Sequence, residues 1–126
     1  ITALLSIDMN GLKTLNDTLG HAAGDEALLT LALCFHKALR NRQYGYRIGG
    51  DEFVIICRKT SQEDVKKLIK RIEDKVGETE YNCAIGYSYR AVGEKSIDDM
   101  LKASDIMMYA AKERYYTQSG KSRRKT

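Results

Sequence analysis

The 126-residue sequence lacks proline and tryptophan altogether, and it contains no internal repeat and no low-complexity segment. Long hydrophobic runs are also missing, since no window approaches the roughly 18 consecutive apolar residues of a membrane-spanning helix. The start of the sequence shows no signal-peptide pattern. These absences predict one ordinary globular domain over residues 1–126, with no membrane contact.

Cysteine and histidine are scarce as well. Cys34, Cys57 and Cys83 are an odd number in separate apolar contexts, which is typical of buried residues in a reducing compartment. We therefore expect a cytoplasmic domain, although an upstream part of the same protein could be anchored in a membrane. His21 and His36 have no cysteine or histidine partner at metal-site spacing, so no zinc site is expected.

Positive charge is in modest excess and gathers at the C-terminal end. The formal net charge is +4, and the basic tail at residues 120–126 is expected to be disordered. No aromatic side chains interleave with these basic residues, so no nucleic-acid partner is expected. The chain begins at Ile1 without a methionine, which indicates an N-terminally truncated fragment of a longer protein.

Hydrophobic periodicity predicts eight elements in the order β-α-α-β-β-α-β-α. The predicted strands span residues 3–7, 44–48, 52–58 and 81–92, and the predicted helices span 10–20, 25–41, 60–77 and 96–117. Thr60 with Glu63 forms a predicted capping box, and Ser96 is predicted to cap the last helix. The inward stripe of that helix is expected to be Ile97, Leu101, Ser104, Met108 and Ala111.

The core of this order, β-α-β-β-α-β, predicts an α+β fold of ferredoxin-like, polymerase-palm-like type, an antiparallel-type sheet with helices packed on it plus extra helices. Right-handed crossovers make the first strand parallel to the first hairpin strand and place the second hairpin strand beside it, antiparallel. Asp8, at the end of the first strand, should therefore lie next to Asp51 and Glu52 at the hairpin.

The hairpin itself is predicted around Gly49-Gly50, the composition of a two-residue type I′ turn, in which both central residues have φ > 0. Asp51 and Glu52 then stand at the start of a strand that is expected to be buried. Such an acid pair is costly to desolvate unless it meets a cation. The alternative is a solvated hairpin tip without function.

Carboxylates that converge on one sheet edge predict a magnesium site. Asp8, Asp51 and Glu52, with a backbone carbonyl such as that of Met9, form a hard oxygen site suited to Mg²⁺. Polymerase-like sites hold two such metals about 3.5–4 Å apart.

Beside this acid site, the strand-to-helix turn at residues 10–12 should expose backbone amides to an anion. Lys13 and Lys112 could meet phosphates as point charges, or they could be ordinary surface lysines.

The residues from Arg47 to Phe53 resemble the signature of the GGDEF domain, the diguanylate cyclase family. Residues 8–17, Gly20-His21, Gly24-Asp25 and 103–112 also match motifs of that family in the right order, so the resemblance covers nearly the whole chain.

The resemblance implies a nucleotidyltransferase of bacterial second-messenger signalling, which condenses two GTP molecules into cyclic di-GMP and two pyrophosphates. Each 3′-hydroxyl attacks the α-phosphate of the opposite nucleotide. One GTP per domain implies a homodimer for turnover, and an upstream sensor or regulatory domain is expected.

The resemblance also implies roles for individual residues. Asp8, the Met9 carbonyl and Asp51 would hold Mg²⁺, two ions per site with Mn²⁺ as a substitute, and Glu52 would lie beside the metals and the reacting hydroxyl. Asn16 and Asp25 would read the guanine edge, or either could simply cap the following helix. The remaining contacts to GTP would come from Gly11, Leu12, Lys13, Gly49, Gly50 and Lys112.

The chain departs from the family pattern at three places. Arg40 matches the start of the Arg-x-x-Asp product site, but Gln43 replaces its aspartate, which puts product inhibition in doubt. Tyr116 stands four residues after Lys112, where the family usually has arginine, and this bears on GTP affinity. The family's segment before the first strand is absent. Asn10 for Asp and Leu12 for Phe are milder changes, because the backbone makes the contacts there.

The sequence also allows functions other than that of a cyclase to be considered on its residues. The main alternative is a non-catalytic GGDEF-like module that binds GTP and serves regulation or dimerisation. A P-loop at Gly120-Lys121-Ser122 is excluded because Tyr115 stands where its first glycine belongs, and an EF-hand is excluded by Leu19 at its twelfth position. A purely structural domain would leave the acid cluster without a purpose.

Overall fold

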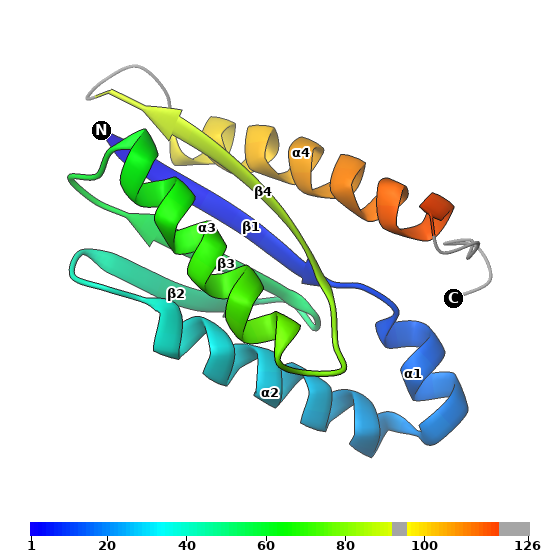
Figure 1. Ribbon diagram of the computed structural model, residues 1–126. Helices are drawn as coiled ribbons and strands as arrows, with labels where there is room; N and C mark the ends of the chain where they lie inside the picture. The colour runs from blue at the N-terminus through cyan, green and yellow to red at the C-terminus, as the bar shows by residue number, and fades with distance from the viewer. Residues whose placement is uncertain (92–95, 119–126) are drawn as a thin grey trace.

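The computed structural model describes residues 1–91 and 96–118, which form eight elements in the predicted order (Figure 1). The strands are β1 (Thr2–Met9), β2 (Gln43–Ile48), β3 (Glu52–Cys57) and β4 (Cys83–Arg90). The helices are α1 (Leu12–Leu19), α2 (His21–Ala38), α3 (Gln62–Gly77) and α4 (Ile97–Gln118). Val92 of the predicted last strand and the basic tail at 120–126 lie outside the described residues.

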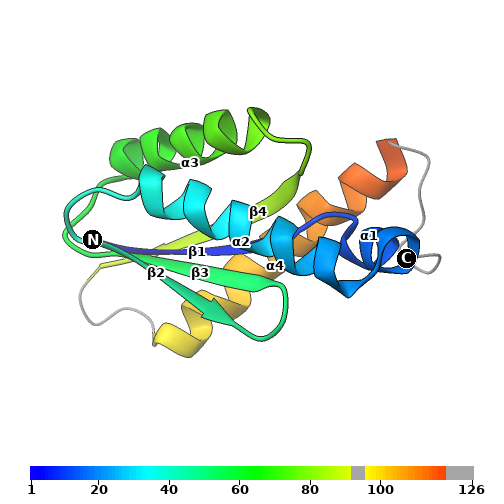
Figure 2. The ribbon, with the colours of Figure 1, turned by 90° about the horizontal axis from the view of Figure 1, so that it is seen from below.

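The four strands form one sheet in the order β2-β3-β1-β4, and every neighbouring pair is antiparallel. Figure 2 shows α2 and α3 on one face of this sheet and α4 on the other. The expected α+β fold is confirmed, including the position of β3 beside β1 that right-handed crossovers require. None of the helices in these described ranges combines the length and apolar composition needed to cross a bilayer.

β1 is buried on both faces because it is a central strand between two helical layers. Its odd-numbered residues, Ala3, Leu5, Ile7 and Met9, belong to the main core with α2 and α3. On the other face, Leu4 packs with Val54 and with Met100 of α4 in a smaller cluster. Alternation along the strand therefore places Ser6 and Asp8 on the α4 side.

α4 packs closely on its face of the sheet at Gly86 of β4. A Cβ atom on Gly86 would lie 2.0 Å from the carbonyl oxygen of Ser104 and 2.3 Å from the amide nitrogen of Met108, so only glycine allows this approach. The Oγ atoms of Ser6 and Ser104 are 2.7 Å apart, and one hydroxyl donates to the other. This contact fixes which side of α4 faces β1.

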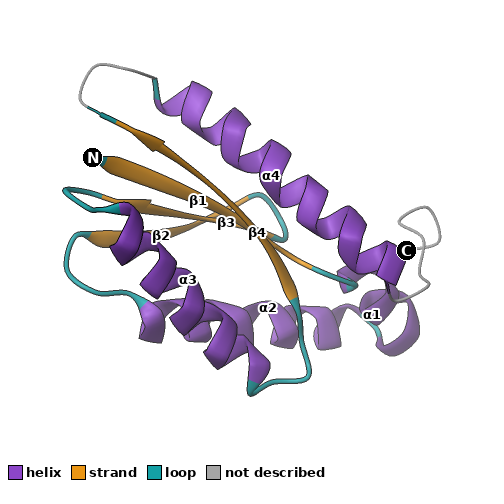
Figure 3. Cartoon of the chain, turned by 45° about the horizontal axis from the view of Figure 1, so that its top comes forward, coloured by secondary structure: helices purple, strands orange, loops and turns teal. Residues whose placement is uncertain are grey.

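The buried stripe of α4 differs in part from the expected one. Its buried residues recur every four positions and are Met100, Ser104, Met108, Lys112 and Tyr116. Ile97 was predicted to point inward but is 41% exposed, since the buried stripe starts only at Met100. The stripe ends with Lys112 and Tyr116, which bond to Met9 and Gly11 at the junction of β1 and α1. Figure 3 shows this C-terminal end of α4 beside α1.

The predictions for the hairpin turn and for the cap of α3 were wrong in detail. Ile48 pairs with Glu52, so the hairpin turn has Gly49, Gly50 and Asp51 between paired residues, and of its glycines only Gly49 has positive φ, at 68°. Asp51 thus belongs to the turn rather than to the strand. The cap of α3 is Ser61, whose Oγ accepts from the Asp64 amide at 3.1 Å, because Thr60 lies one residue too early.

The cap predicted for the last helix is confirmed. The amide of Asp99 donates to Ser96 Oγ at 3.1 Å, three residues after the cap, as an N-cap requires.

Candidate active site at the end of β1

Asp8 lies near the end of β1, and the register of the sheet determines which residues of β3 are its neighbours. It pairs with Glu52 across the β1–β3 ladder, so the acids of the first strand and of the hairpin are adjacent, as the topology predicted. Asp8 is 8% exposed, and its Oδ1 atom is buried without a hydrogen-bond partner. Burial raises the pKa of Asp8 to about 6, against the opposing effect of Lys112, and the nearby Asp51 carboxylate adds to the increase.

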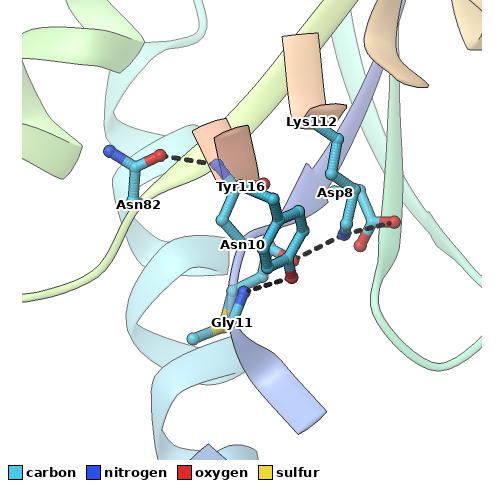
Figure 4. Close-up of polar contacts among 7 residues, drawn as sticks. Asp8, Asn10, Gly11, Asn82, Lys112 and Tyr116 are labelled. Atoms are coloured by element: carbon cyan, nitrogen blue, oxygen red, sulfur yellow. Dashed lines mark hydrogen bonds and ion pairs between the residues drawn. The ribbon is translucent and has the colours of Figure 1, made fainter. Parts of the chain in front are cut away.

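Lys112 extends from α4 to the same place. Its Nζ lies 3.1 Å from Asp8 Oδ2 and donates a hydrogen bond to the Met9 carbonyl oxygen at 2.9 Å (Figure 4). Lys112 is itself only 8% exposed. The sequence assigned this lysine to phosphates, whereas here its ammonium group binds the two oxygens expected to hold a metal ion.

Glu52 is the second acid with an altered protonation equilibrium. Burial raises its pKa to about 7, and the nearby negative charge of Asp105 on α4 contributes the next largest effect. The Oδ1 atom of Asp105 is buried and has no hydrogen-bond partner. Sequence reasoning missed Asp105 as a site residue, although its spacing of seven residues from Lys112, two helical turns, places both on one side of α4.

The donor set can be compared with what a magnesium ion requires. Within residues 1–91 and 96–118, no three His, Cys, Asp or Glu side chains are grouped so that they could hold a metal ion. Asp8 nevertheless offers an unpartnered buried oxygen, and the cation of Lys112 already lies between Asp8 and the Met9 carbonyl. These oxygens fit Mg²⁺, which commonly takes one or two protein carboxylates and completes its shell with water and substrate phosphates.

The turn from β1 into α1 is less open than its sequence predicted. Gly11 has φ 75°, which positions it as the residue before α1. The Asn10 amide donates to the Asn82 carbonyl at 2.9 Å, and the Gly11 amide donates to the Tyr116 hydroxyl at 3.0 Å. Both amides were expected to be exposed, but the backbone before β4 and the last turn of α4 cover them. Asn82 and Tyr116 were not expected as partners.

The two residues assigned to guanine lie on adjacent helices. Asn16 is inside α1 and Asp25 is inside α2, and the residue before α2 is Gly20, so neither side chain caps a helix as the alternative required. A Cβ on Gly24 would lie 1.7 Å from Asn16 Oδ1, which shows that the Asn16 side chain lies against Gly24. Asn16 Oδ1 is buried without a hydrogen-bond partner.

The other residues predicted to contact GTP are more exposed. Lys13 is exposed on α1, and Leu12 begins that helix half-buried. Gly49 and Gly50 are exposed in the hairpin turn, where the Arg47 Nε donates to the Gly50 carbonyl at 3.1 Å. The structure thus brings Asp8, Glu52 and Lys112 together and leaves the hairpin glycines at the surface.

The stretch that matches the product site lines a separate polar hollow beside α3, together with Asp64, Lys67 and Arg71 of that helix. Gln43 Oε1 accepts from the Arg40 amide at 2.7 Å and from the guanidinium of Arg71 at 3.3 Å. The guanidinium of Arg40 donates to backbone carbonyls of residues 37–39. Gln43 therefore keeps an oxygen between the two arginines but lacks the negative charge of an aspartate.

A family model described as "Diguanylate cyclase, GGDEF domain" matches residues 1–118. The probable diguanylate cyclase DgcJ of Escherichia coli (strain K12) is 37% identical over 112 residues, which are 86% of this chain and 23% of that protein. A diguanylate cyclase of Vibrio cholerae serotype O1 is 34% identical over 116 residues, covering 86% of this chain and 36% of that protein. The chain thus spans well under half the length of these relatives.

Solved structures agree with this assignment. The active GGEEF domain of a diguanylate cyclase from Vibrio cholerae superposes with a TM-score of 0.81 at 30% identity, over 90% of this chain and 77% of that one. The diguanylate cyclase SiaD of Pseudomonas aeruginosa, solved with its activator SiaC, shares the fold, with a TM-score of 0.84 at 24% identity over 90% of this chain and 46% of that one. The chain belongs to the GGDEF domain family of diguanylate cyclases.

Proposed function

We propose that this chain is a catalytic domain that condenses two molecules of GTP into cyclic di-GMP and two pyrophosphates, one GTP being held by each of two copies. The observation that supports this most directly is the meeting of Asp8 with the hairpin acids, beneath a cation from α4. A nucleotide polyphosphate with its metal needs such a combination of hard oxygen ligands and positive charge.

In this proposal, Asp8, the Met9 carbonyl and Asp51 hold Mg²⁺. When bound, the metal supplies positive charge that stabilises the attacking and leaving oxygens at the α-phosphate. The buried, unpartnered Oδ1 of Asp8 supports this role, because a buried carboxylate oxygen is costly unless a cation or donor meets it. Lys112 Nζ lies 3.1 Å from Asp8 Oδ2, and we expect it to shift from Asp8 to the phosphates when the nucleotide binds.

Glu52 is proposed to accept the proton of the attacking 3′-hydroxyl. A pKa of about 7, raised by burial and by Asp105, is close to the value at which a carboxylate is both ionised and basic at neutral pH. The hydroxyl oxygen then forms a bond to the α-phosphorus of the opposite nucleotide, and the bond to the β-phosphate oxygen breaks to release pyrophosphate. Two such events close the ring.

Guanine selectivity is proposed to reside in Asn16 and Asp25. A carboxylate accepts both the N1–H and the exocyclic amino hydrogens of guanine, whereas adenine has an acceptor at N1. The Oδ1 atom of Asn16 is buried without a hydrogen-bond partner, which supports a role for it as an acceptor from guanine. Lys13, Gly11 and Leu12 are proposed to meet the phosphates at the start of α1.

Turnover is proposed to require two copies face to face and an upstream element that brings them together. The chain accounts for only 23% of DgcJ and 36% of the Vibrio cholerae relative, so those proteins contain much further sequence. Any sensory input of the present protein is expected to act through such a segment.

The proposal is tested by fusing the domain to a dimerising coiled coil and measuring cyclic di-GMP formed from GTP and Mg²⁺. Asp51→Ala is expected to abolish product, while Asp74→Ala, an exposed acid on α3, is the matched control and should retain it. Calorimetry with non-hydrolysable GTP and ATP analogues checks the base assignment. Asp25→Ala should weaken binding of the GTP analogue by about tenfold or more, without a comparable loss for ATP.

Three results would contradict the proposal. Unchanged turnover in Asp51→Ala would remove that residue from the mechanism, and equal affinity of the wild type for GTP and ATP would contradict the guanine roles. Nucleotide binding without product from the dimerised wild type would favour the non-catalytic module instead.

A further inference from the structure

We propose that Tyr116 lowers the affinity of the site for its substrate, because its hydroxyl occupies a backbone amide that a substrate phosphate would otherwise bind. This inference rests on the proposed function, since it concerns the phosphate end of the same site. It assigns a role to a residue that neither the acid cluster nor the guanine contacts explain.

The contact itself lies at the start of α1. The Gly11 amide donates to the Tyr116 hydroxyl at 3.0 Å, and Tyr116 is only 5% exposed (Figure 4). Amides at the beginning of a helix have no partner within the helix, and they point outward at a position that favours anions. In the free protein the hydroxyl oxygen takes the place of such an anion.

Lys112, one turn earlier on the same stripe of α4, makes the matching contact. Its ammonium group binds Asp8 Oδ2 at 3.1 Å and the Met9 carbonyl at 2.9 Å, which are the oxygens proposed for the metal. One helix therefore presents a cation to the metal ligands and an oxygen to the phosphate-binding amide. Figure 4 shows these two side chains next to each other over the end of β1.

For the substrate to bind, the contacts of Lys112 with Asp8 and of Tyr116 with Gly11 must both be replaced by contacts to metal and phosphate. The two replacements differ in their effect on affinity. Lys112 remains a cation and can bind the phosphates after it leaves Asp8, so its interaction is not lost. The Tyr116 hydroxyl is neutral, and its removal from Gly11 costs a hydrogen bond that a phosphate then replaces. A bond of this kind is typically equivalent to about fivefold in an equilibrium constant. Tyr116 thus acts as an affinity-determining residue.

The test uses Tyr116→Phe, which keeps the buried ring and removes only the hydroxyl. Tyr109→Phe, seven residues earlier on α4 and 42% exposed, is the matched control for the same chemical change. Calorimetry with Mg²⁺ and a non-hydrolysable GTP analogue should show about fivefold tighter binding by Tyr116→Phe and no change for Tyr109→Phe. Amide exchange at Gly11, followed by NMR without nucleotide, should become faster only in Tyr116→Phe.

Each outcome decides the inference. If the wild type binds and Tyr116→Phe binds equally well or more weakly, the inference is overturned and the proposed function stays intact. The hydroxyl would then have no effect on affinity, or would itself contact the phosphate. Binding by Tyr116→Phe alone would support it strongly. Absence of binding in all three proteins would overturn both this inference and the proposed nucleotide site.

Discussion

The two faces of β1 differ in kind. On one face, Leu5 and its odd-numbered neighbours pack with α2 and α3 in a wholly apolar core. On the other face, Leu4, Ser6 and Asp8 point toward α4. They contact Met100, the hydroxyl of Ser104 and the ammonium group of Lys112, respectively. The layer of α2 and α3 therefore mainly stabilises the sheet, whereas α4 aligns polar groups along β1 that end in the candidate site.

The largest expected effect comes from breaking the apolar face. Leu5→Ala removes a fully buried side chain and should lower the free energy of unfolding by about 2–5 kcal/mol, through lost burial and the cavity left behind. Leu33→Ala, on α2 and 51% exposed, is the control and should change stability little. Chemical denaturation measures both. Similar losses for the two variants would contradict the distinction between core and surface.

A smaller loss of stability, with a larger effect on the site, is expected when α4 is pushed away from the sheet. Gly86→Ala places a methyl group against the backbone of Ser104 and Met108, and it should cost about 1–3 kcal/mol as an overpacking change. Because α4 also holds Lys112, nucleotide binding should weaken together with stability. Gly77→Ala, where nothing lies within 4 Å, is the control. Unaltered nucleotide binding in a destabilised Gly86→Ala would separate the packing of α4 from the site.

Removing the cation of the α4 face should strengthen metal binding by the free domain. In Lys112→Met no ammonium group competes for Asp8 Oδ2 and the Met9 carbonyl, so Mn²⁺ alone should bind about tenfold more tightly, by calorimetry without nucleotide. Lys102→Met, an exposed lysine on α4, is the control. Unchanged or weaker Mn²⁺ binding would show that these oxygens are not the metal ligands.

The smallest effect is a dependence of stability on pH. The pKa of Asp8 is raised from 3.8 to about 6, so the folded state prefers the protonated carboxyl. The stability that protonation contributes is fully present below the lower value and is lost as the pH rises through about 6. The free energy of unfolding should therefore fall over this range more in the wild type than in Asp8→Asn. Parallel curves for the two proteins would contradict the raised pKa.

Much of the fold follows from local patterns in the sequence. The apolar spacing of α2 and α3 and the split order of strands and helices predict the sheet order, and with it the meeting of Asp8 and Glu52. The predictions for the hairpin turn and for the cap of α3 were each wrong by one residue: the turn includes Asp51, and the cap is Ser61 rather than Thr60. Composition alone does not distinguish such neighbouring positions. Such ambiguities leave the topology unchanged.

Contacts across α4 could not be predicted in the same way. Which of its side chains face the sheet depends on how the helix rotates against it, and the close approach at Gly86 and the Ser6–Ser104 hydrogen bond determine that rotation. Asp105 therefore became visible as a site residue only in three dimensions, and so did the partner of Tyr116, a position that the sequence had already linked to GTP affinity. The same holds for the Gly11 amide, whose partner lies 105 residues away in the sequence.

The amino-acid order alone determined the family, the element order and the edge at which the acids gather, because periodicity, chain direction and crossover handedness restrict the sheet to few arrangements. Only the packing of α4 on the sheet determined that Lys112 pairs with Asp8 and that the Tyr116 hydroxyl accepts from the Gly11 amide. The reason is physical: a hydrogen bond or ion pair forms only within about 3–4 Å, and packing of a rigid helix on a twisted sheet sets distances on that scale.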